Sequence, residues 1–278
     1  MIKNIVNISD LHCGCRLGLC PPEVKMDDGG TYHHSRLQAI VWEYWNTFWD
    51  EWVPKVTKGE DYVIVNNGDS IDGSHHGSTT QISQNIEDQV RIAEQILLPR
   101  IQHKKCKGYY HIRGTEAHVG KSGADEERLA RMLGAIPNAE GQFARWELWA
   151  ELGSHNKLCH FTHHIGTTSS MAYESTAVHK ELVEAYNEAG RWNERPPDLI
   201  SRGHRHRSYK IELPNDNGMA IVVITPGWQL KTPFTYRLAS GRSGEPQIGG
   251  FIIREGDEDS LYARSKVWGM KRSETVKL

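Results

Sequence analysis

The sequence predicts an α/β fold in which two central β-sheets pack together and are flanked by helices. Apolar runs typical of buried strands alternate with amphipathic helices in the first half, and the second half is richer in strands. Polar residues follow several of the expected strands. The chain has 278 residues and shows no internal repeat or convincing linker, so we expect one domain over residues 1–278.

Three strands and three helices alternate in the first half. Apolar residues at steps of three and four predict a helix from Leu37 to Trp52, with Ser35 as its N-cap and Pro54 as its stop. A second helix is expected over 86–101, kinked near Pro99. A third is expected over 125–135 with a glycine at its end. The expected strands are 3–10, 61–69 and 107–114.

The second half contains one long helix among strands. That helix is expected from about Ala172 to Ala189 and should be closed by Gly190. The expected strands are 144–152, 157–164, 196–207, 208–214, 219–227, 249–255 and 260–268.

Composition favours a soluble protein of the cytoplasm. The formal net charge is −2, from 33 basic and 35 acidic residues, so bulk charge favours neither nucleic acid nor an anionic membrane as a partner. The start "MIKNIVNISD" lacks the apolar stretch of a signal sequence, and no window approaches the ~18 apolar residues of a membrane span. Five cysteines are an odd count that favours reduced thiols.

Carboxylates and imidazoles follow five of the expected strands, and ligands bind beyond the carboxyl ends of strands in open α/β sheets. Both groups suit divalent metals such as Mn, Fe, Co, Zn or Ni. Six candidate ligands exceed what one tetrahedral ion takes, so we expect two ions, about 3.5–4 Å apart, that activate a bridging water. The candidates are Asp10, His12, Asp69, His163, His204 and His206.

Each short motif also has an interpretation without function. "GDSIDG" alone would be a turn, and "GHRHR" alone a solvated basic turn. The paired histidines at 33–34 and 75–76 are expected to be exposed loop residues. A zinc site at Cys13, Cys15 and Cys20 is an alternative that lacks C-x₂-C spacing, so we expect buried or loop thiols. The order of all the blocks together is what favours a metal centre.

At these residues the sequence resembles the calcineurin-like metallophosphoesterases, whose pattern is D-x-H, G-D-x-x-D, G-N-H-[DE], an isolated His and G-H-x-H. Asp10–His12, Gly68–Asp72, His163 and Gly203–His206 match four of the five blocks. The resemblance implies a four-layer α-β-β-α sandwich with two mixed central sheets. It also implies one ion held by Asp10, His12, Asp69 and His206, and another held by Asp69, His163 and His204, with Asp69 as the bridge.

One block departs from the family pattern, because "GTEAH" stands at residues 114–118. Thr115 occupies the place of the family's metal-binding asparagine, and a neutral hydroxyl is a poorer ligand. Glu116 could supply an oxygen instead, or His118 could take either role. We expect His118 to be the catalytic acid that faces the leaving oxygen. The second ion is then expected to be weakly held or replaceable.

The resemblance implies hydrolysis of phosphoester bonds, with a hydroxide that bridges the two ions attacking phosphorus. Arg113 and Arg205 are the predicted phosphate-binding residues, beside Arg202 and Arg207 as further candidates. A phosphodiesterase or nuclease acting on nucleotidic substrates is favoured over a phosphomonoesterase or protein phosphatase. A non-catalytic metal-binding scaffold is the alternative of another class. Trp228, Phe234 and Tyr236 could stack a base or belong to the core.

Overall fold

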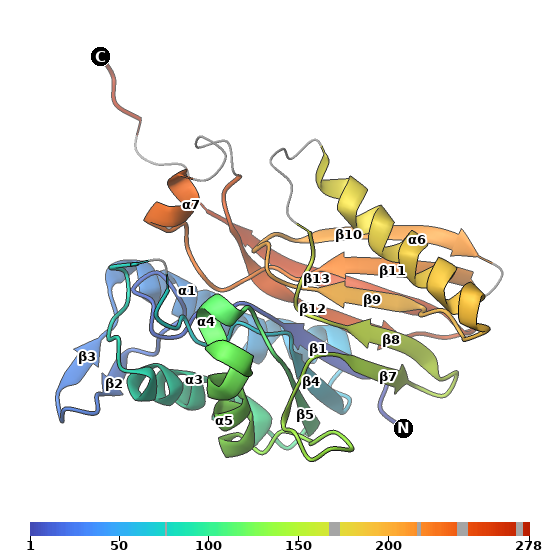
Figure 1. Cartoon of the computed structure of the whole chain (residues 1–278), viewed down its shortest axis with the longest axis horizontal. Helices are drawn as coiled ribbons and strands as arrows, with labels where there is room; N and C mark the ends of the chain where they lie inside the picture. The colour runs from blue at the N-terminus through green and yellow to red at the C-terminus, as the bar shows by residue number, and fades with distance from the viewer. Residues whose placement is uncertain (76, 167–172, 216–217, 238–243, 271–274) are drawn as a thin grey trace.

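Two mixed β-sheets face each other in the centre of the computed structural model, which describes residues 1–75, 77–166, 173–215, 218–237, 244–270 and 275–278 (Figure 1). The first sheet has the order β13 (Leu261–Gly269), β12 (Gln247–Glu255), β1 (Asn4–Ile8), β4 (Tyr62–Asn66), β5 (Cys106–Ile112) and β6 (Ala144–Arg145). The second has the order β10 (Tyr209–Asn215), β11 (Gly218–Ile224), β9 (Leu199–Arg202), β8 (Lys157–Phe161) and β7 (Leu148–Leu152). A small hairpin joins β2 (Glu23–Lys25) to β3 (Thr31–His33).

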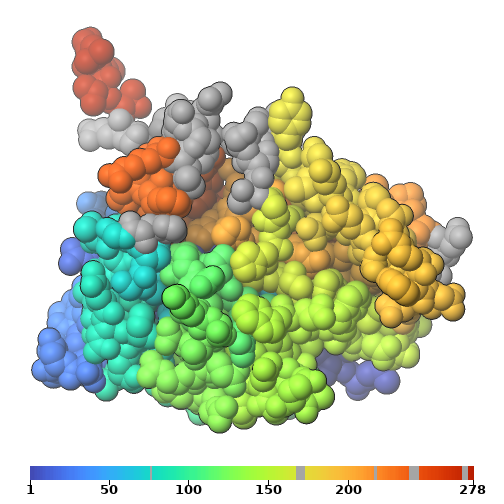
Figure 2. Space-filling view, viewed as in Figure 1, coloured from blue at the N-terminus to red at the C-terminus, as the bar shows by residue number. Residues whose placement is uncertain are grey.

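Helices cover the outer faces of both sheets. On the first sheet lie α1 (Arg36–Thr47), the π-helical turn Phe48–Trp52, α2 (Val53–Thr57), α3 (Ile86–Ile101) and α5 (Ala124–Met132). The second sheet carries α6 (Glu174–Trp192). Three short helical segments complete the set: α4 (Glu116–Val119), the 3-10 turn Lys121–Gly123 and α7 (Pro233–Arg237). In the space-filling view the region of α3 to α5 (cyan to green) and α6 (yellow) form separate parts of the surface (Figure 2).

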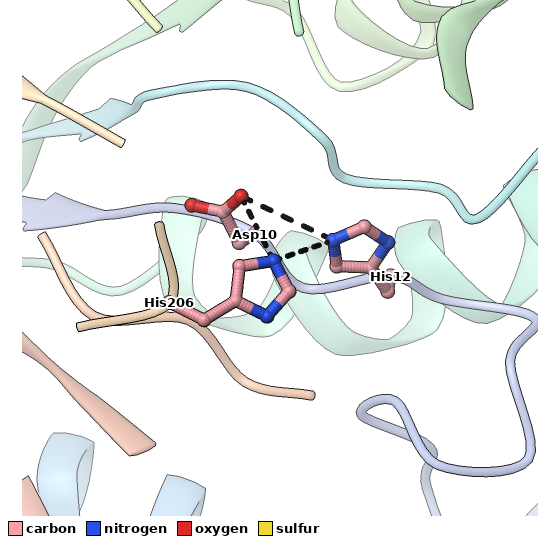
Figure 3. A group of neighbouring side chains, drawn as sticks. All are labelled: Asp10, His12 and His206. Atoms are coloured by element: carbon pink, nitrogen blue, oxygen red, sulfur yellow. Dashed lines mark hydrogen bonds and ion pairs between the residues drawn. The ribbon is translucent and has the colours of Figure 1, made fainter. Parts of the chain in front are cut away.

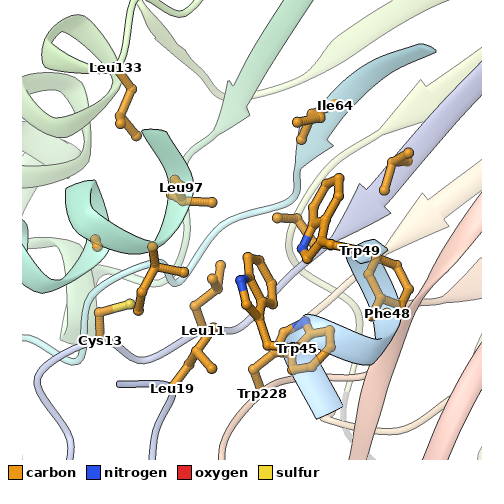
Figure 4. Packing of buried hydrophobic residues seen from close by; sticks show 14 of the residues in the cluster. Leu11, Cys13, Leu19, Trp45, Phe48, Trp49, Ile64, Leu97, Leu133 and Trp228 are labelled. Atoms are coloured by element: carbon orange, nitrogen blue, oxygen red, sulfur yellow. The ribbon is translucent and has the colours of Figure 1, made fainter. Parts of the chain in front are cut away.

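Three apolar layers hold the four structural layers together. One lies between the first sheet and its helices, one between the two sheets, and one between the second sheet and α6. The predicted four-layer arrangement of two mixed sheets is therefore confirmed. Aromatic rings fill the first layer (Figure 4): Trp228 meets Trp45 at 4.8 Å and Phe48 at 5.6 Å between ring centroids, both nearly perpendicular. Trp228 is fully buried, so it is a core residue and not a platform for a base.

Two helix ends differ from the expectation. The first helix does not stop at Pro54 but continues to Thr57, because the π-helical turn leads into α2 and puts the proline in the first turn, where its missing N–H is not needed. The last long helix passes Gly190 and ends at Trp192, where Asn193 adopts the left-handed conformation (φ 55°). Its expected start at Ala172 lies outside the described residues. Ser35 caps α1 as expected.

Parallel pairing brings the polar strand ends to a common edge. β1, β4 and β5 are adjacent and parallel in the first sheet, and β8, β9 and β11 are adjacent and parallel in the second. Asn7 joins the two sheets, because its side-chain amide donates to the hydroxyls of Ser201 (2.6 Å) and Thr225 (2.8 Å).

Among the described residues, none of the helices combines the length and apolar character needed to cross a bilayer.

Candidate metal centre

The loops that follow four strands bring all six predicted metal ligands together. Asp10 and His12 follow β1, Asp69 follows β4, His163 follows β8, and the last two follow β9. Their ligand atoms form two groups in which all atoms lie within 4.8 Å of one another. These groups are Asp10, His12 and His206, and Asp69, His163 and His204.

The backbone at these residues adopts a conformation that L-residues rarely take. Five of the six predicted ligands have positive φ: Asp10 55°, His12 46°, Asp69 53°, His204 70° and His206 50°. Outside glycine this region costs roughly 1–3 kcal/mol per residue and persists where the surrounding structure imposes it. Here the loops lock one another, since the Asp10 amide donates to Gly68 O (2.9 Å) and the His12 amide to Asp69 O (3.0 Å). Strained backbone at the polar strand ends indicates a functional centre.

In the first group, three ligand atoms point toward one another (Figure 3). The Nε2 atoms of His12 and His206 are 3.0 Å apart, and Asp10 Oδ1 lies 3.2 Å from His206 Nε2 and 4.0 Å from His12 Nε2. Within the described part of the chain, Asp10 Oδ1 is buried and accepts no hydrogen bond. A buried carboxylate oxygen that faces two imidazole nitrogens without a hydrogen bond fits a bound cation.

The second group repeats this arrangement around His163. Its Nδ1 lies 2.6 Å from the carbonyl oxygen of Asn67, so this nitrogen carries a proton and Nε2 is the nitrogen that offers a lone pair when the ring is neutral. Nε2 lies 3.0 Å from Asp69 Oδ2, and among the described residues it is buried without a hydrogen-bond partner. The ring of His204 lies 5.5 Å from that of His163. A lone pair and a carboxylate oxygen that face each other also fit a divalent cation.

Asp72 contacts the centre, although the sequence analysis gave it no role. Its carboxylate is buried and lies 3.2 Å from His12 Nδ1, and it accepts hydrogen bonds from the side-chain amides of Gln81 (2.9 Å) and Gln229 (3.2 Å). A carboxylate on the far nitrogen fixes the tautomer and the ring of a metal-binding histidine. The signal was present, because Asp72 is the second aspartate of the G-D-x-x-D block.

His75 corrects one expectation. Instead of lying exposed in a loop, its side chain is 13% exposed, its Nε2 lies 3.7 Å from Asp72 Oδ2, and its ring meets that of His118 at 4.3 Å. His76 lies outside the described residues, and His33 is exposed as expected.

The divergent block 114–118 places its three polar residues differently. Thr115 donates to Asp69 from its amide (2.7 Å to Oδ1) and from its hydroxyl (3.1 Å to Oδ1 and 3.0 Å to Oδ2). Glu116 is exposed on α4 and belongs to none of the groups found among the described residues. His118 lies inward, with Nδ1 2.6 Å from Asp72 O, and its ligand atom forms a group with those of His12 and Asp69. Its ring is also 4.5 Å from that of His12.

The carboxylates and imidazoles of the centre shift one another's pKa. Burial alone would raise the pKa of Asp10, but the imidazoles of His206 and His163 hold it well below its usual value. Burial would lower the pKa of His163, but the carboxylates of Asp69 and Asp10 raise it to about 10. Burial lowers the pKa of His204 to about 4, with a further contribution from His163, and burial also lowers that of His118 to about 4.

The predicted phosphate-binding residue Arg113 is buried among hydrogen-bond acceptors. Its side chain is 8% exposed and donates to Ala144 O (2.9 Å), Ser122 O (2.6 Å) and Glu127 Oε2 (3.3 Å). Each of its nitrogens thus has a partner in β6, in the 3-10 turn or in α5, and its role in phosphate binding stays a prediction.

The other arginines separate into two kinds. Arg202 and Arg207 form ion pairs with Glu181 (2.8 Å) and Glu174 (3.0 Å) of α6. Arg205 contacts Glu174 O through Nη1 (3.3 Å), while its buried Nε and Nη2 have no hydrogen-bond partner among the described residues. Arg205 therefore remains the arginine that can bind an anion.

The cysteines form no metal group within the described residues. Cys13, Cys15 and Cys20 are buried, and burial raises the pKa of Cys15 to about 11 and that of Cys20 to about 12. They are core thiols, as expected. Phe234 and Tyr236 are exposed on α7, with 47% and 58% of their surface accessible.

No family model and no curated protein matches the sequence. Several solved structures are similar. Protein TM1076 of Thermotoga maritima is 12% identical with a TM-score of 0.36, covering 96% of this chain and all of that one. Vps29 of Chaetomium thermophilum is 9% identical with a TM-score of 0.35, covering 96% and 97%. The 5′-nucleotidase of Candida albicans is 9% identical with a TM-score of 0.39, covering 94% and 51%. With TM-scores below 0.5, these similarities carry no inference about the family or the activity of this chain.

Proposed function

We propose that this chain hydrolyses phosphoester bonds with two divalent metal ions, as the calcineurin-like metallophosphoesterases do. The observation that carries the proposal is the convergence of six carboxylate and imidazole ligands, five of them on left-handed backbone. Asp10 Oδ1 and His163 Nε2, buried and without hydrogen bonds in the described part of the chain, fit cations at this place. Two bound divalent ions would activate water and stabilise the charge on the entering and leaving oxygens.

The chain's own residues hold this centre in a fixed geometry. Asp69 has one oxygen toward His163 and lies in a group with His12 as well, so it is placed to bridge two ions. Asp72 and the carbonyl of Asn67 orient the rings of His12 and His163 through their Nδ1 atoms. Donors of this kind leave the metal identity open among Mn, Fe, Zn and Ni.

Arg205 supports binding of the phosphoester group. It lies between two predicted ligands in the sequence, and its Nε and Nη2 have no hydrogen-bond partner among the described residues. These two N–H groups form the edge of the guanidinium that binds two oxygens of a phosphate at once. We assign Arg205 to the non-bridging oxygens of the substrate.

A nucleotidic substrate is supported by the position of α7. Gln229 contacts Asp72 of the centre, and α7 begins four residues later, at Pro233. Its exposed rings of Phe234 and Tyr236 offer surfaces on which a base can stack, an interaction worth about 1–3 kcal/mol per base. A phosphodiesterase or nuclease on nucleotidic substrates is therefore preferred to a general phosphomonoesterase that makes no contact with a base.

One observation favours a second candidate, a non-catalytic metal-binding scaffold. Thr115 stands where the family pattern has a metal-binding asparagine, and its hydroxyl hydrogen-bonds Asp69. The ion held by His163 and His204 then has fewer ligands, and its loss would leave one structural ion.

Metal analysis and turnover together test the proposal. The protein is loaded with Mn²⁺, its metal content is measured, and hydrolysis of bis-p-nitrophenyl phosphate is compared with that of p-nitrophenyl phosphate. We expect two equivalents of metal and faster turnover of the diester, with both metal and turnover lost in Asp69→Ala. Asp28→Ala, which removes an exposed carboxylate, is the matched control. One equivalent of metal without turnover of either ester would favour the scaffold.

A further inference from the structure

A seventh residue reaches the centre from a block that lacks the family's metal-binding asparagine. The ligand atom of His118 lies within 4.8 Å of those of His12 and Asp69, and its ring contacts the edge of the His12 ring at 4.5 Å between centroids. Within the described residues, His118 also forms a group with Asp72 and His75, and no group joins it to His163 or His204. His118 therefore belongs to the side of the centre formed by Asp10, His12 and His206.

The hydrogen bonding of His118 fixes which of its nitrogens can bind a metal. Nδ1 lies 2.6 Å from the carbonyl oxygen of Asp72. A carbonyl oxygen only accepts, so Nδ1 carries the proton, and Nε2 of the neutral ring carries a lone pair. In this form Nε2 has a lone pair that can bind a metal, and it has no proton to give to a leaving group.

Two predicted ligands show the same arrangement. His12 Nδ1 lies 3.2 Å from Asp72 Oδ1, and His163 Nδ1 lies 2.6 Å from Asn67 O. Each of the three rings thus has Nδ1 on an oxygen acceptor, which leaves Nε2 for a metal. This is how proteins orient histidines toward metal ions.

The backbone holds His118 in this position. Gly73 has φ +69°, and a Cβ atom there would lie 2.3 Å from the carbonyl oxygen of His118. The loop of Asp69–Gly73 is therefore pressed against α4, and only glycine permits the approach. The same loop supplies Asp72 O to the ring, so backbone and side chain of His118 are fixed by one segment.

From these contacts we propose that His118 is a metal ligand and not the proton donor expected from the sequence. His12 belongs both to the group of Asp10 and His206 and to the group of Asp69 and His118, so His118 would add a donor to the ion at His12. That ion would then draw on five side chains, whereas Asp69, His163 and His204 would give the other ion three. This inference rests on the proposed function, since it takes the two ions as given. Its consequence is a centre with one tight and one weak site.

Metal titration of the metal-free protein tests the inference. Isothermal titration calorimetry with Mn²⁺ should resolve two affinities in the wild type. In His118→Ala the affinity of the tighter site should fall by at least about tenfold, while that of the weaker site stays unchanged. Tenfold is the lower limit because loss of a residue that only orients a ligand already lowers metal affinity by about 10–100-fold. His179→Ala is the matched control, because His179 also has Nδ1 on a backbone carbonyl (Ser175 O, 2.9 Å) but lies exposed on α6. Its two affinities should equal those of the wild type.

A second variant guards against a loss of folding. His118→Gln can place an amide oxygen toward the ion, so it should bind more tightly than His118→Ala, and circular dichroism and thermal midpoints check that both fold. If His118→Ala binds both ions as the wild type does but loses turnover, the ligand assignment is wrong and His118 acts as the acid. If the wild type itself binds no Mn²⁺, the proposed function fails, and the inference with it.

Discussion

Glu126 is expected to stabilise both the fold and the loops that carry the metal centre. Its side chain is fully buried on α5, where Oε1 accepts the amide of Ser70 (2.8 Å) and Oε2 accepts the amide of Gly114 (2.6 Å). Ser70 follows Asp69 directly, and Gly114 precedes Thr115. One carboxyl group thus joins the two loops whose side chains meet at Asp69.

The cost of removing this group follows from the two amides. Glu126→Ala leaves both buried N–H groups without an acceptor, at about 1–3 kcal/mol each, so the free energy of unfolding should fall by about 2–6 kcal/mol. Glu126→Gln keeps the shape and one acceptor but turns an NH₂ group toward the other amide, so about half of that loss is expected. Because the loops carry Asp69 and Thr115, both variants should also bind Mn²⁺ more weakly.

Urea denaturation of the metal-free protein measures the first effect, and metal titration the second. Asp125→Asn on the same helix is the control, because this half-buried neighbour should change the free energy of unfolding by no more than about 0.5 kcal/mol. If Glu126→Ala were as stable as that control, the two short amide contacts would not support the loops, and the reasoning would be refuted.

Three further predictions concern single side chains. Asp72→Asn should weaken Mn²⁺ binding about 10–100-fold in a titration, because the His12 ring loses its carboxylate partner; unchanged affinity would contradict this. In Gly114→Ala the new Cβ would lie 2.0 Å from Asp69 Oδ1, so metal binding measured by mass spectrometry should drop sharply, and wild-type metal content would count against the geometry. Burial, and then the charge of Arg202, lower the pKa of His160 from 6.5 to about 4. Between about pH 4 and 6.5 the folded state therefore binds fewer protons than the unfolded state. The contribution of His160 to the free energy of unfolding is thus fully present above pH 6.5 and is lost as the pH drops to about 4, by at most about 3 kcal/mol. Urea midpoints at pH 4.5 and 7 should differ less in His160→Gln than in the wild type, and an equal difference would exclude His160 as the cause.

Much of the fold was predictable because its signals are local. Buried strands such as β1 and β4 are short apolar runs, and each ends just before a polar block. The helix ends were harder, because Pro54 and Gly190 stop helices only where tertiary contacts allow. The π-helical turn before Pro54 buries Phe48 and Trp49 in the core, and no local pattern reveals it.

The metal centre, like the fold, was predictable only where the signal is local. The six predicted ligands come together because each follows a parallel strand, a relation that spacing alone predicts. The contacts of Arg113 and Glu126 depend on which segments lie beside them, and these segments are distant in the sequence. The direction of the His118 ring depends on a single carbonyl oxygen of Asp72. Such contacts leave no trace in a motif.

The central claim is that this chain holds two divalent ions that share Asp69. Crystals grown with Mn²⁺ and measured for anomalous scattering test it directly. We predict two anomalous peaks about 3.5–4 Å apart, with Asp69 between them, one also beside Asp10, His12 and His206 and the other beside His163 and His204. A map with no peak at these residues, or with peaks elsewhere on the chain, would contradict the account.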